Sequence, residues 1–168
     1  MRPDTLSAAQ ELPGHNGRVP RPVCPADAAV IALHRYPEEA DAHERPVYAA
    51  WVADALRRGV YVGFLALDEE TVVAGAGLTL LEWGPTRGDA SPCRARIVNV
   101  WTHPEQRRRS LARTLVTLCL EAARERGVTR VSLGTSGMAR PLYEGLGFRA
   151  SGTGIGLVLG GEEPPAEA

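Results

Sequence analysis

The chain has 168 residues, of which 44% are hydrophobic and 23% charged, a composition typical of one globular domain and not of a fibrous or disordered protein. The 19 basic residues nearly balance the 20 acidic ones, which disfavours a general nucleic-acid-binding protein. No apolar run approaches the ~20 residues that a membrane-spanning helix needs, so no membrane partner is expected.

The use of arginine and cysteine narrows the chemistry further. All 19 residues counted as Lys or Arg are arginines, which excludes a lysine nucleophile or Schiff base. The three cysteines, Cys24, Cys93 and Cys119, are odd in number and widely spaced, so neither a disulfide framework nor a Cys-x-x-Cys metal pair is expected. The first 20 residues lack the apolar core of a signal peptide. We therefore expect a cytoplasmic protein that needs no metal.

Hydrophobic periodicity and turn residues divide the chain into one domain at 21–159, with a flexible lead-in at 1–20 and a flexible tail at 160–168. The order of elements predicts a mixed, mainly antiparallel sheet with helices on both faces. The predicted strands are 21–24, 60–67, 71–82, 94–102, 130–133, 148–151 and 155–159. The predicted helices are 28–34, 44–58, 110–127 and 139–146.

Two of these elements carry specific expectations about side-chain direction. In the helix at 44–58, a stripe through Val47, Trp51 and Ala55 predicts a buried face, so Trp51 is interpreted as a core residue. In the strand at 94–102, simple alternation places Asn99 and Trp101 on one face. Cys119, in the middle of an apolar helix face, is expected to be a core residue and a poor nucleophile.

The turn between the strand at 94–102 and the helix at 110–127 concentrates positive charge. Residues 94–113 contain six arginines and one acidic residue, in a chain of net charge −1. A helix that starts directly after a strand presents unpaired backbone N–H groups and the positive end of its dipole. This combination favours a multiply charged phosphate ligand, and the alternative is a solvated basic helix start.

A second segment, 136–148, places Tyr143 on a short helix that follows a buried strand. A phenol can donate a proton to a departing thiolate, because its pKa lies above that of a thiol. The alternative is a core tyrosine that packs against Leu142 and Phe148.

Together, in this order and about thirty residues apart, the two segments resemble the GNAT acetyltransferase superfamily. The family's phosphate-binding pattern, Gln/Arg-x-x-Gly-x-Gly/Ala, is matched here by Arg107-Arg108-Arg109-Ser110-Leu111-Ala112. Its later pattern, Asn-x-x-Ala-x-x-Leu-Tyr-x-x-x-Gly-Phe, is matched by Ser136, Ala139, Leu142, Tyr143, Gly147 and Phe148. The resemblance covers residues 21–159 and implies the GNAT fold, an α/β (α+β) arrangement in which a mixed, mainly antiparallel sheet of about six or seven strands is flanked by about four helices.

The resemblance also implies acetyl-CoA as the acyl donor and assigns its contacts. The backbone of Val100, Trp101 and Thr102 would pair with the pantetheine arm. Ser136 would contact the donor from the family's asparagine position, and Tyr143 would be the general acid that reprotonates the coenzyme A sulfur. The pyrophosphate would lie on the turn formed by Arg107, Arg108, Arg109, Ser110, Leu111, Ala112 and Arg113.

The chain departs from the family pattern at three of these positions. Arg108 and Ser110 stand where glycine is common, and glycine lets a backbone approach phosphate without a Cβ. Ser110 is expected to act as a helix N-cap and to offer its hydroxyl to phosphate. Ser136 replaces the family's asparagine. These departures leave open a donor other than acetyl-CoA.

The acceptor side is less determined by the sequence. Glu82, Asp89 and His103 are candidates for a general base, although each is more simply interpreted as structural or solvated. Trp83 and the loop at 84–93 are expected to border the acceptor pocket together with the first two helices.

The expected activity is transfer of an acetyl group from acetyl-CoA to a primary amine of a small molecule or peptide, by direct attack in a ternary complex. One alternative is a GNAT-like transferase that uses aminoacyl-tRNA as donor in natural-product biosynthesis, which would suit the basic turn but not the neutral overall charge. Another is a non-catalytic acyl-CoA-binding module. The acceptor and the oligomeric state stay open, although a homodimer is compatible with the resemblance.

Overall fold

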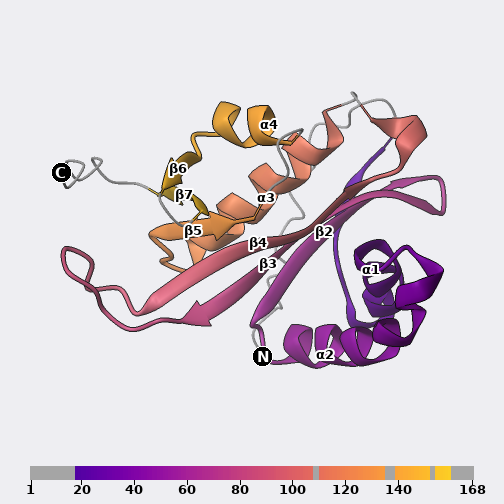
Figure 1. Ribbon diagram of the computed structural model, residues 1–168, viewed down its shortest axis with the longest axis horizontal. Helices are drawn as coiled ribbons and strands as arrows, with labels where there is room; N and C mark the ends of the chain where they lie inside the picture. Colours follow the sequence, from indigo (N-terminus) through magenta and orange to yellow (C-terminus); the bar gives the residue numbers. More distant parts are fainter. Residues whose placement is uncertain (1–17, 108–109, 135–138, 152–153, 160–168) are drawn as a thin grey trace, which may run out of the picture.

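The computed structural model describes residues 18–107, 110–134, 139–151 and 154–159. A seven-stranded sheet with the spatial order β1-β2-β3-β4-β5-β7-β6 runs through the molecule (Figure 1). Its strands are β1 (Pro20–Pro22), β2 (Tyr61–Asp68), β3 (Thr71–Glu82), β4 (Cys93–Thr102), β5 (Arg130–Leu133), β6 (Arg149–Ser151) and β7 (Gly154–Val158). Neighbouring strands are antiparallel except β4 and β5, which are parallel. The predicted mixed, mainly antiparallel sheet is confirmed.

Within the described residues, four α-helices flank this sheet, as predicted. They are α1 (Ala28–Arg35), α2 (Arg45–Arg57), α3 (Leu111–Glu125) and α4 (Arg140–Gly145). Three short 3-10 segments, η1 (Pro25–Asp27), η2 (Glu39–Glu44) and η3 (Pro104–Gln106), precede α1, α2 and α3. Gly59, two residues after the end of α2, has φ of +72°, a conformation that glycine adopts without a Cβ penalty, and so the chain can turn into β2.

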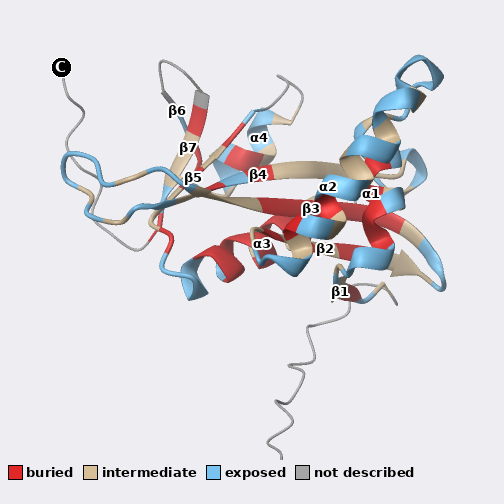
Figure 2. Ribbon diagram, turned by 90° about the horizontal axis from the view of Figure 1, so that it is seen from below, coloured by how far each residue is buried: buried red, intermediate tan, exposed pale blue. Residues whose placement is uncertain are grey.

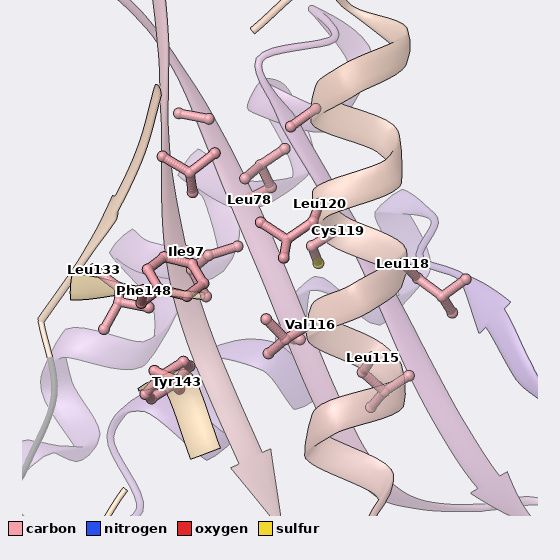
Figure 3. Close-up of a cluster of buried hydrophobic side chains, with 14 of the residues drawn as sticks. Leu78, Ile97, Leu115, Val116, Leu118, Cys119, Leu120, Leu133, Tyr143 and Phe148 are labelled. Carbon is pink, nitrogen blue, oxygen red and sulfur yellow. The ribbon is translucent and has the colours of Figure 1, made fainter. Parts of the chain in front are cut away.

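One main core lies between the sheet and α3. Figure 2 shows buried residues along the inner face of α3. Leu115, Val116 and Cys119 of this face are 0% exposed. These side chains pack against Leu78 of β3 and Ile97 of β4 (Figure 3). Burial raises the pKa of the Cys119 thiol to about 12, so it is a core residue and not a nucleophile at neutral pH.

A second, smaller core lies where α1 and α2 pack on the sheet, and it corrects the predicted face of α2. Val52 and Ala55 are fully buried, whereas Val47 is 72% and Trp51 38% exposed. The buried face is rotated because Tyr48, not Val47, turns toward the sheet and reaches β4 with its hydroxyl. The interpretation of Trp51 as a core residue was therefore wrong: the indole lies at the rim, 5.7 Å from the Tyr48 ring.

The ends of the chain lie largely outside the described residues. Of the lead-in, Arg18 pairs with Asp68 of β2 at 3.3 Å, and β1 begins at Pro20. No helix among the residues described combines the length and apolar character that crossing a bilayer requires.

Candidate active site

The central feature of the site is an opening between β4 and β5. The two strands pair at Ala95–Val131 and Arg96–Ser132 and then diverge. Beyond this point a cavity of about 340 Å³ lies between β4, the end of β5, α1 and α4. The cavity is lined by His34, Arg35, Ile97, Val98, Asn99, Val100, Trp101, Leu133, Gly134, Ala139 and Tyr143. Val100 and Trp101, predicted to contact the donor, thus face the same cavity as Tyr143.

A bulge in β4 interrupts the predicted alternation at the wall of this cavity. Gly77 pairs with Val98 and Gly75 with Trp101, so Asn99 and Val100 together stand opposite one residue of β3. Asn99 has φ of +55°, the left-handed conformation that asparagine tolerates better than most residues. Simple alternation was therefore wrong here, because a bulge adds one residue to a strand and redirects the side chains after it.

The Asn99 side chain joins three other elements. Its Nδ2 donates to the hydroxyls of Tyr48 in α2, at 2.8 Å, and of Tyr61 in β2, at 3.0 Å. Its Oδ1 accepts a hydrogen bond from Arg35 at 3.2 Å. Gly77 makes room for Tyr61, since a Cβ there would overlap the tyrosine hydroxyl. Burial raises the pKa of Tyr61, so the hydroxyl keeps its proton.

At the α1 side of the cavity, His34 stacks on Trp101 with ring centroids 3.6 Å apart and planes 10° from parallel. Burial lowers the pKa of His34 to about 4, because desolvation disfavours the imidazolium. The ring is therefore neutral at pH 7. The adjacent Arg35 lies over the Tyr48 ring, 4.7 Å from its centroid.

Tyr143 packs as the core tyrosine that the sequence offered as one alternative, and its role as a general acid stays a prediction. It is 5% exposed and meets Phe148 edge to face, with centroids 5.8 Å apart (Figure 3). It also lines the cavity. Burial, with a smaller effect from Cys119, raises the pKa of Tyr143, so the phenol holds its proton at neutral pH. None of the described residues forms a hydrogen bond with its hydroxyl.

The start of α3 differs from the prediction for Ser110. This residue has φ of +60° and ψ of +16°, and its side chain makes no capping hydrogen bond. The N-cap expectation was wrong because capping requires an extended backbone, whereas Ser110 is left-handed. Left-handed geometry is what glycine provides at this position of the family pattern.

The surroundings of Ser110 agree with an anion site. The first intrahelical bond is accepted by Ser110 from Thr114, so the N–H groups of Leu111, Ala112 and Arg113 start the helix without partners in it. Leu111 is buried beneath the turn, Arg107 is exposed, and the Arg113 guanidinium reaches the Gly145 carbonyl of α4 at 3.4 Å. Arg108, Arg109 and Ser136, also predicted to bind the donor, lie outside the described residues. Thr102 ends β4 by pairing with Ala74.

The three candidate bases do not line the cavity. Asp89 accepts hydrogen bonds from Ser91 N at 3.0 Å and Thr129 at 2.8 Å, and it pairs with Arg130 at 3.3 Å. These contacts hold the β3–β4 loop against β5 and lower the pKa of Asp89, the Ser91 hydrogen bond most of all. Glu82 is exposed at the far end of β3. His103 accepts from Glu105 N at 3.2 Å and so caps η3.

The sequence interpretation missed the residues of α1, α2 and β2 that gather around Asn99. One signal was available: an asparagine between Val98 and Val100 is unusual in a strand and indicates a bulge or turn. The other partners carried no local signal, since they lie 38 to 64 residues from Asn99. Among the described residues, no three His, Cys, Asp or Glu side chains gather closely enough to hold a metal ion.

Comparisons with solved structures agree with this architecture. A predicted acetyltransferase of Clostridium acetobutylicum, solved with acetyl-CoA, superimposes with a TM-score of 0.75 at 19% identity, covering 80% of this chain and 92% of its own. A GCN5-related N-acetyltransferase of Ralstonia eutropha gives 0.74 at 24% identity, covering 90% and 100%. A Salmonella typhimurium protein assigned as an acetyltransferase, solved with acetyl-CoA, gives 0.67 at 19%, covering 91% and 100%. At these identities the likeness shows the fold.

The family follows from the sequence match. No curated protein matches the chain. The sequence model of the acetyltransferase (GNAT) family, however, matches residues 27–148, which include α1, the bulged strand β4, the start of α3 and Tyr143. The chain therefore belongs to the GNAT acetyltransferase family.

Proposed function

We propose that this protein transfers an acetyl group from acetyl-CoA to a primary amine. The observation that carries the proposal is the cavity between β4 and β5, which joins the strand edge predicted to bind the donor to Tyr143. Membership of the GNAT family supports the reaction class, and two of the similar structures were solved with acetyl-CoA.

The residues present fit such a donor. Because β5 pairs with β4 only as far as Arg96, the backbone of β4 from Ile97 onward has no strand partner on that side among the described residues, and the amides of pantetheine match it. The unpaired N–H groups at the start of α3 and the positive end of its dipole suit the pyrophosphate. The arginines of the same turn add charge.

Within this site each group has one task. Acetyl-CoA supplies an activated thioester, and the amine nitrogen attacks its carbonyl in neutral form after losing a proton to solvent. The bulge at Asn99 adds one residue to β4 at the wall of the cavity, and backbone N–H groups of this segment would polarise the carbonyl oxygen. Tyr143 holds a proton on its phenol oxygen and donates it to the leaving thiolate.

Thermal unfolding with acetyl-CoA tests the donor directly. At ~100 times its dissociation constant, acetyl-CoA should stabilise the fold by about 2.7 kcal/mol, which raises Tm by roughly 5–10 °C for a domain of this size. Free coenzyme A and aminoacyl-tRNA are the comparisons. The absence of a shift at saturating acetyl-CoA would overturn the proposal, and salt-sensitive stabilisation by aminoacyl-tRNA alone would favour the tRNA-dependent transferase.

Release of free thiol during incubation with acetyl-CoA and a panel of amines then tests transfer. Turnover of any primary amine supports the enzyme. Binding of acetyl-CoA without turnover across the panel would instead favour a non-catalytic acyl-CoA-binding module.

A further inference from the structure

We propose that the acceptor amine carries a carboxylate, and that Arg96 binds it at the mouth of the cavity. This inference rests on the proposed function and names the substrate class of the same site. Three observations support the inference: the position of Arg96, the lack of acidic side chains among the described residues that line the cavity, and a second cavity beside the first.

Arg96 lies where β4 and β5 separate. A Cβ built on Gly134, a lining residue of the cavity, would stand 3.1 Å from the Arg96 guanidinium. The side chain is exposed, and it makes no hydrogen bond or ion pair with any residue that the structure describes. A guanidinium that lies at a cavity mouth without a carboxylate partner is available to an anionic ligand.

The neighbours of Arg96 on the sheet also suit an anion. Thr79 of β3 and Ser132 of β5 are its register partners on either side, so two hydroxyl-bearing side chains flank the guanidinium on one face of the sheet. Hydroxyl groups donate to carboxylate oxygens. Neither flanking position carries an acid that would neutralise the arginine.

The donor phosphates do not account for Arg96. Thr102, at the end of β4, is six positions farther along the chain, which corresponds to roughly 20 Å along an extended strand. The predicted pyrophosphate site lies beyond that end, at the start of α3. Arg96 therefore faces the acyl end of the opening, where the acceptor enters.

The charge of the cavity points the same way. None of the described residues that line it is acidic, and the neighbouring segment 135–138 contains no acidic residue in the sequence. Arg35, which lines the cavity, has Asn99 and two tyrosines as partners, and no carboxylate of the described part of the chain pairs with it. By contrast, Arg94 and Arg130 farther along the sheet both lie near Asp89. A polycationic acceptor would meet only repulsion in the cavity.

A cavity of about 430 Å³ on the other side of Ser132 offers room for the rest of the acceptor. Leu81, Trp83 and Val158 line it together with Arg94, Arg130 and Arg149, so it accommodates an apolar body among basic side chains. Aliphatic and aromatic amino acids are therefore the probes of choice.

The test is acetyl-CoA-dependent thiol release with matched pairs of amines, each α-amino acid beside its carboxamide. Polyamines and aminoglycosides form the cationic comparison. We expect amino acids to be turned over with a higher kcat/KM than their amides, and the polycations to be poor acceptors. A preference for amides or polycations would overturn the inference.

Arg96→Gln identifies the residue responsible. It should raise KM for the preferred amino acid by roughly 10- to 100-fold, the value of a lost charge-assisted hydrogen bond, and leave the matching amide unaffected. Arg124→Gln is the control, because Arg124 is exposed on α3, which covers the opposite face of the sheet. Equal losses for acid and amide would overturn the assignment of Arg96.

Binding of acetyl-CoA is measured separately from turnover of the acceptor. The acetyl-CoA shift in Tm should be the same in wild type and Arg96→Gln. If acetyl-CoA stabilises the protein but no carboxylate-bearing amine is turned over, the acceptor inference is wrong and the proposed donor stands. If acetyl-CoA does not bind, the proposed function itself is overturned.

Discussion

The side-chain amide of Asn99 donates to the buried hydroxyl of Tyr61 across 3.0 Å, which ties the bulge of β4 to strand β2. The two residues are 38 positions apart, and β3 lies between their strands in the sheet. Tyr61 can approach because Gly77 of β3 has no side chain. The wall of the cavity is thus held by a polar contact that passes over a glycine.

We expect Asn99→Ala to destabilise the fold by about 2 kcal/mol or more, since it leaves the Tyr61 hydroxyl buried without its donor and places alanine in a left-handed conformation. Asn99→Gly removes the same amide, but glycine tolerates the left-handed conformation. The glycine variant should therefore be about 1 kcal/mol more stable than the alanine variant. Urea unfolding of both variants measures the two effects. Equal losses would show that backbone conformation contributes nothing at this position.

At Ser110, an alanine and a glycine variant separate the effect of the side chain from that of the backbone conformation. Because its side chain makes no capping bond, Ser110→Ala should change the free energy of unfolding by less than about 0.5 kcal/mol. Ser110→Gly should raise it by roughly 1 kcal/mol, since glycine accepts φ of +60° without a Cβ penalty. Chemical denaturation decides this. A loss of about 1 kcal/mol in the alanine variant would instead reveal a role for the hydroxyl.

Tyr143→Phe should lower kcat by about 100-fold or more, the usual effect of removing a general acid, and leave acetyl-CoA binding intact. The fold should survive, because the ring still meets Phe148 edge to face. Steady-state kinetics and the acetyl-CoA shift in Tm provide the two readouts. Tyr36→Phe is the control, since that hydroxyl contacts Arg35 and does not line the cavity. Full activity in Tyr143→Phe would rule out its role as the acid.

His34 should make stability fall as the pH falls from about 6.5 to 4. The unfolded state binds a proton on His34 near pH 6.5, whereas its folded pKa is about 4, so the stabilisation is complete above pH 6.5 and is lost below it. The expected loss between pH 7 and pH 5 is about 1–2 kcal/mol. His34→Phe keeps a flat ring on Trp101 and should flatten this slope in urea unfolding at each pH.

The control for that slope is His43→Gln, since His43 is exposed on η2. It should leave the pH dependence of wild type unchanged. If His34→Phe shows the same slope as wild type, other titrating groups cause it.

The sequence predicted most of the fold because its signals are local. Turn residues and runs of strand-forming residues predicted the bounds of β3 and β5 as observed, Thr71–Glu82 and Arg130–Leu133, and the apolar stripe of α3 lies on the main core. The face of α2 was misjudged because tyrosine has an apolar ring and a polar tip, and a hydrophobicity pattern does not show where the tip finds a partner.

For the site, the sequence supports residue predictions chiefly on the donor side, where the residues form two short patterns, and those roles stay predictions. The acceptor side depends on β-strand register. Arg96 lies at the cavity because β4 and β5 stop pairing at that residue, and Asn99 meets Arg35 from a position 64 residues away. The hydrophobic pattern within a single strand does not indicate where that strand separates from its neighbour. Long-range pairing of this kind becomes visible only in the folded chain.

The absence of lysine matters in a protein that binds a thioester, because a lysine side chain is itself a primary amine. A lysine at the position of Arg35 or Arg96 would bring a primary amine to an activated acyl group and could itself be acylated. A guanidinium keeps its charge and its proton at any physiological pH, so it can attract an anionic substrate without competing with it. The cations around this cavity are therefore inert toward the very reagent that the site is built to hold.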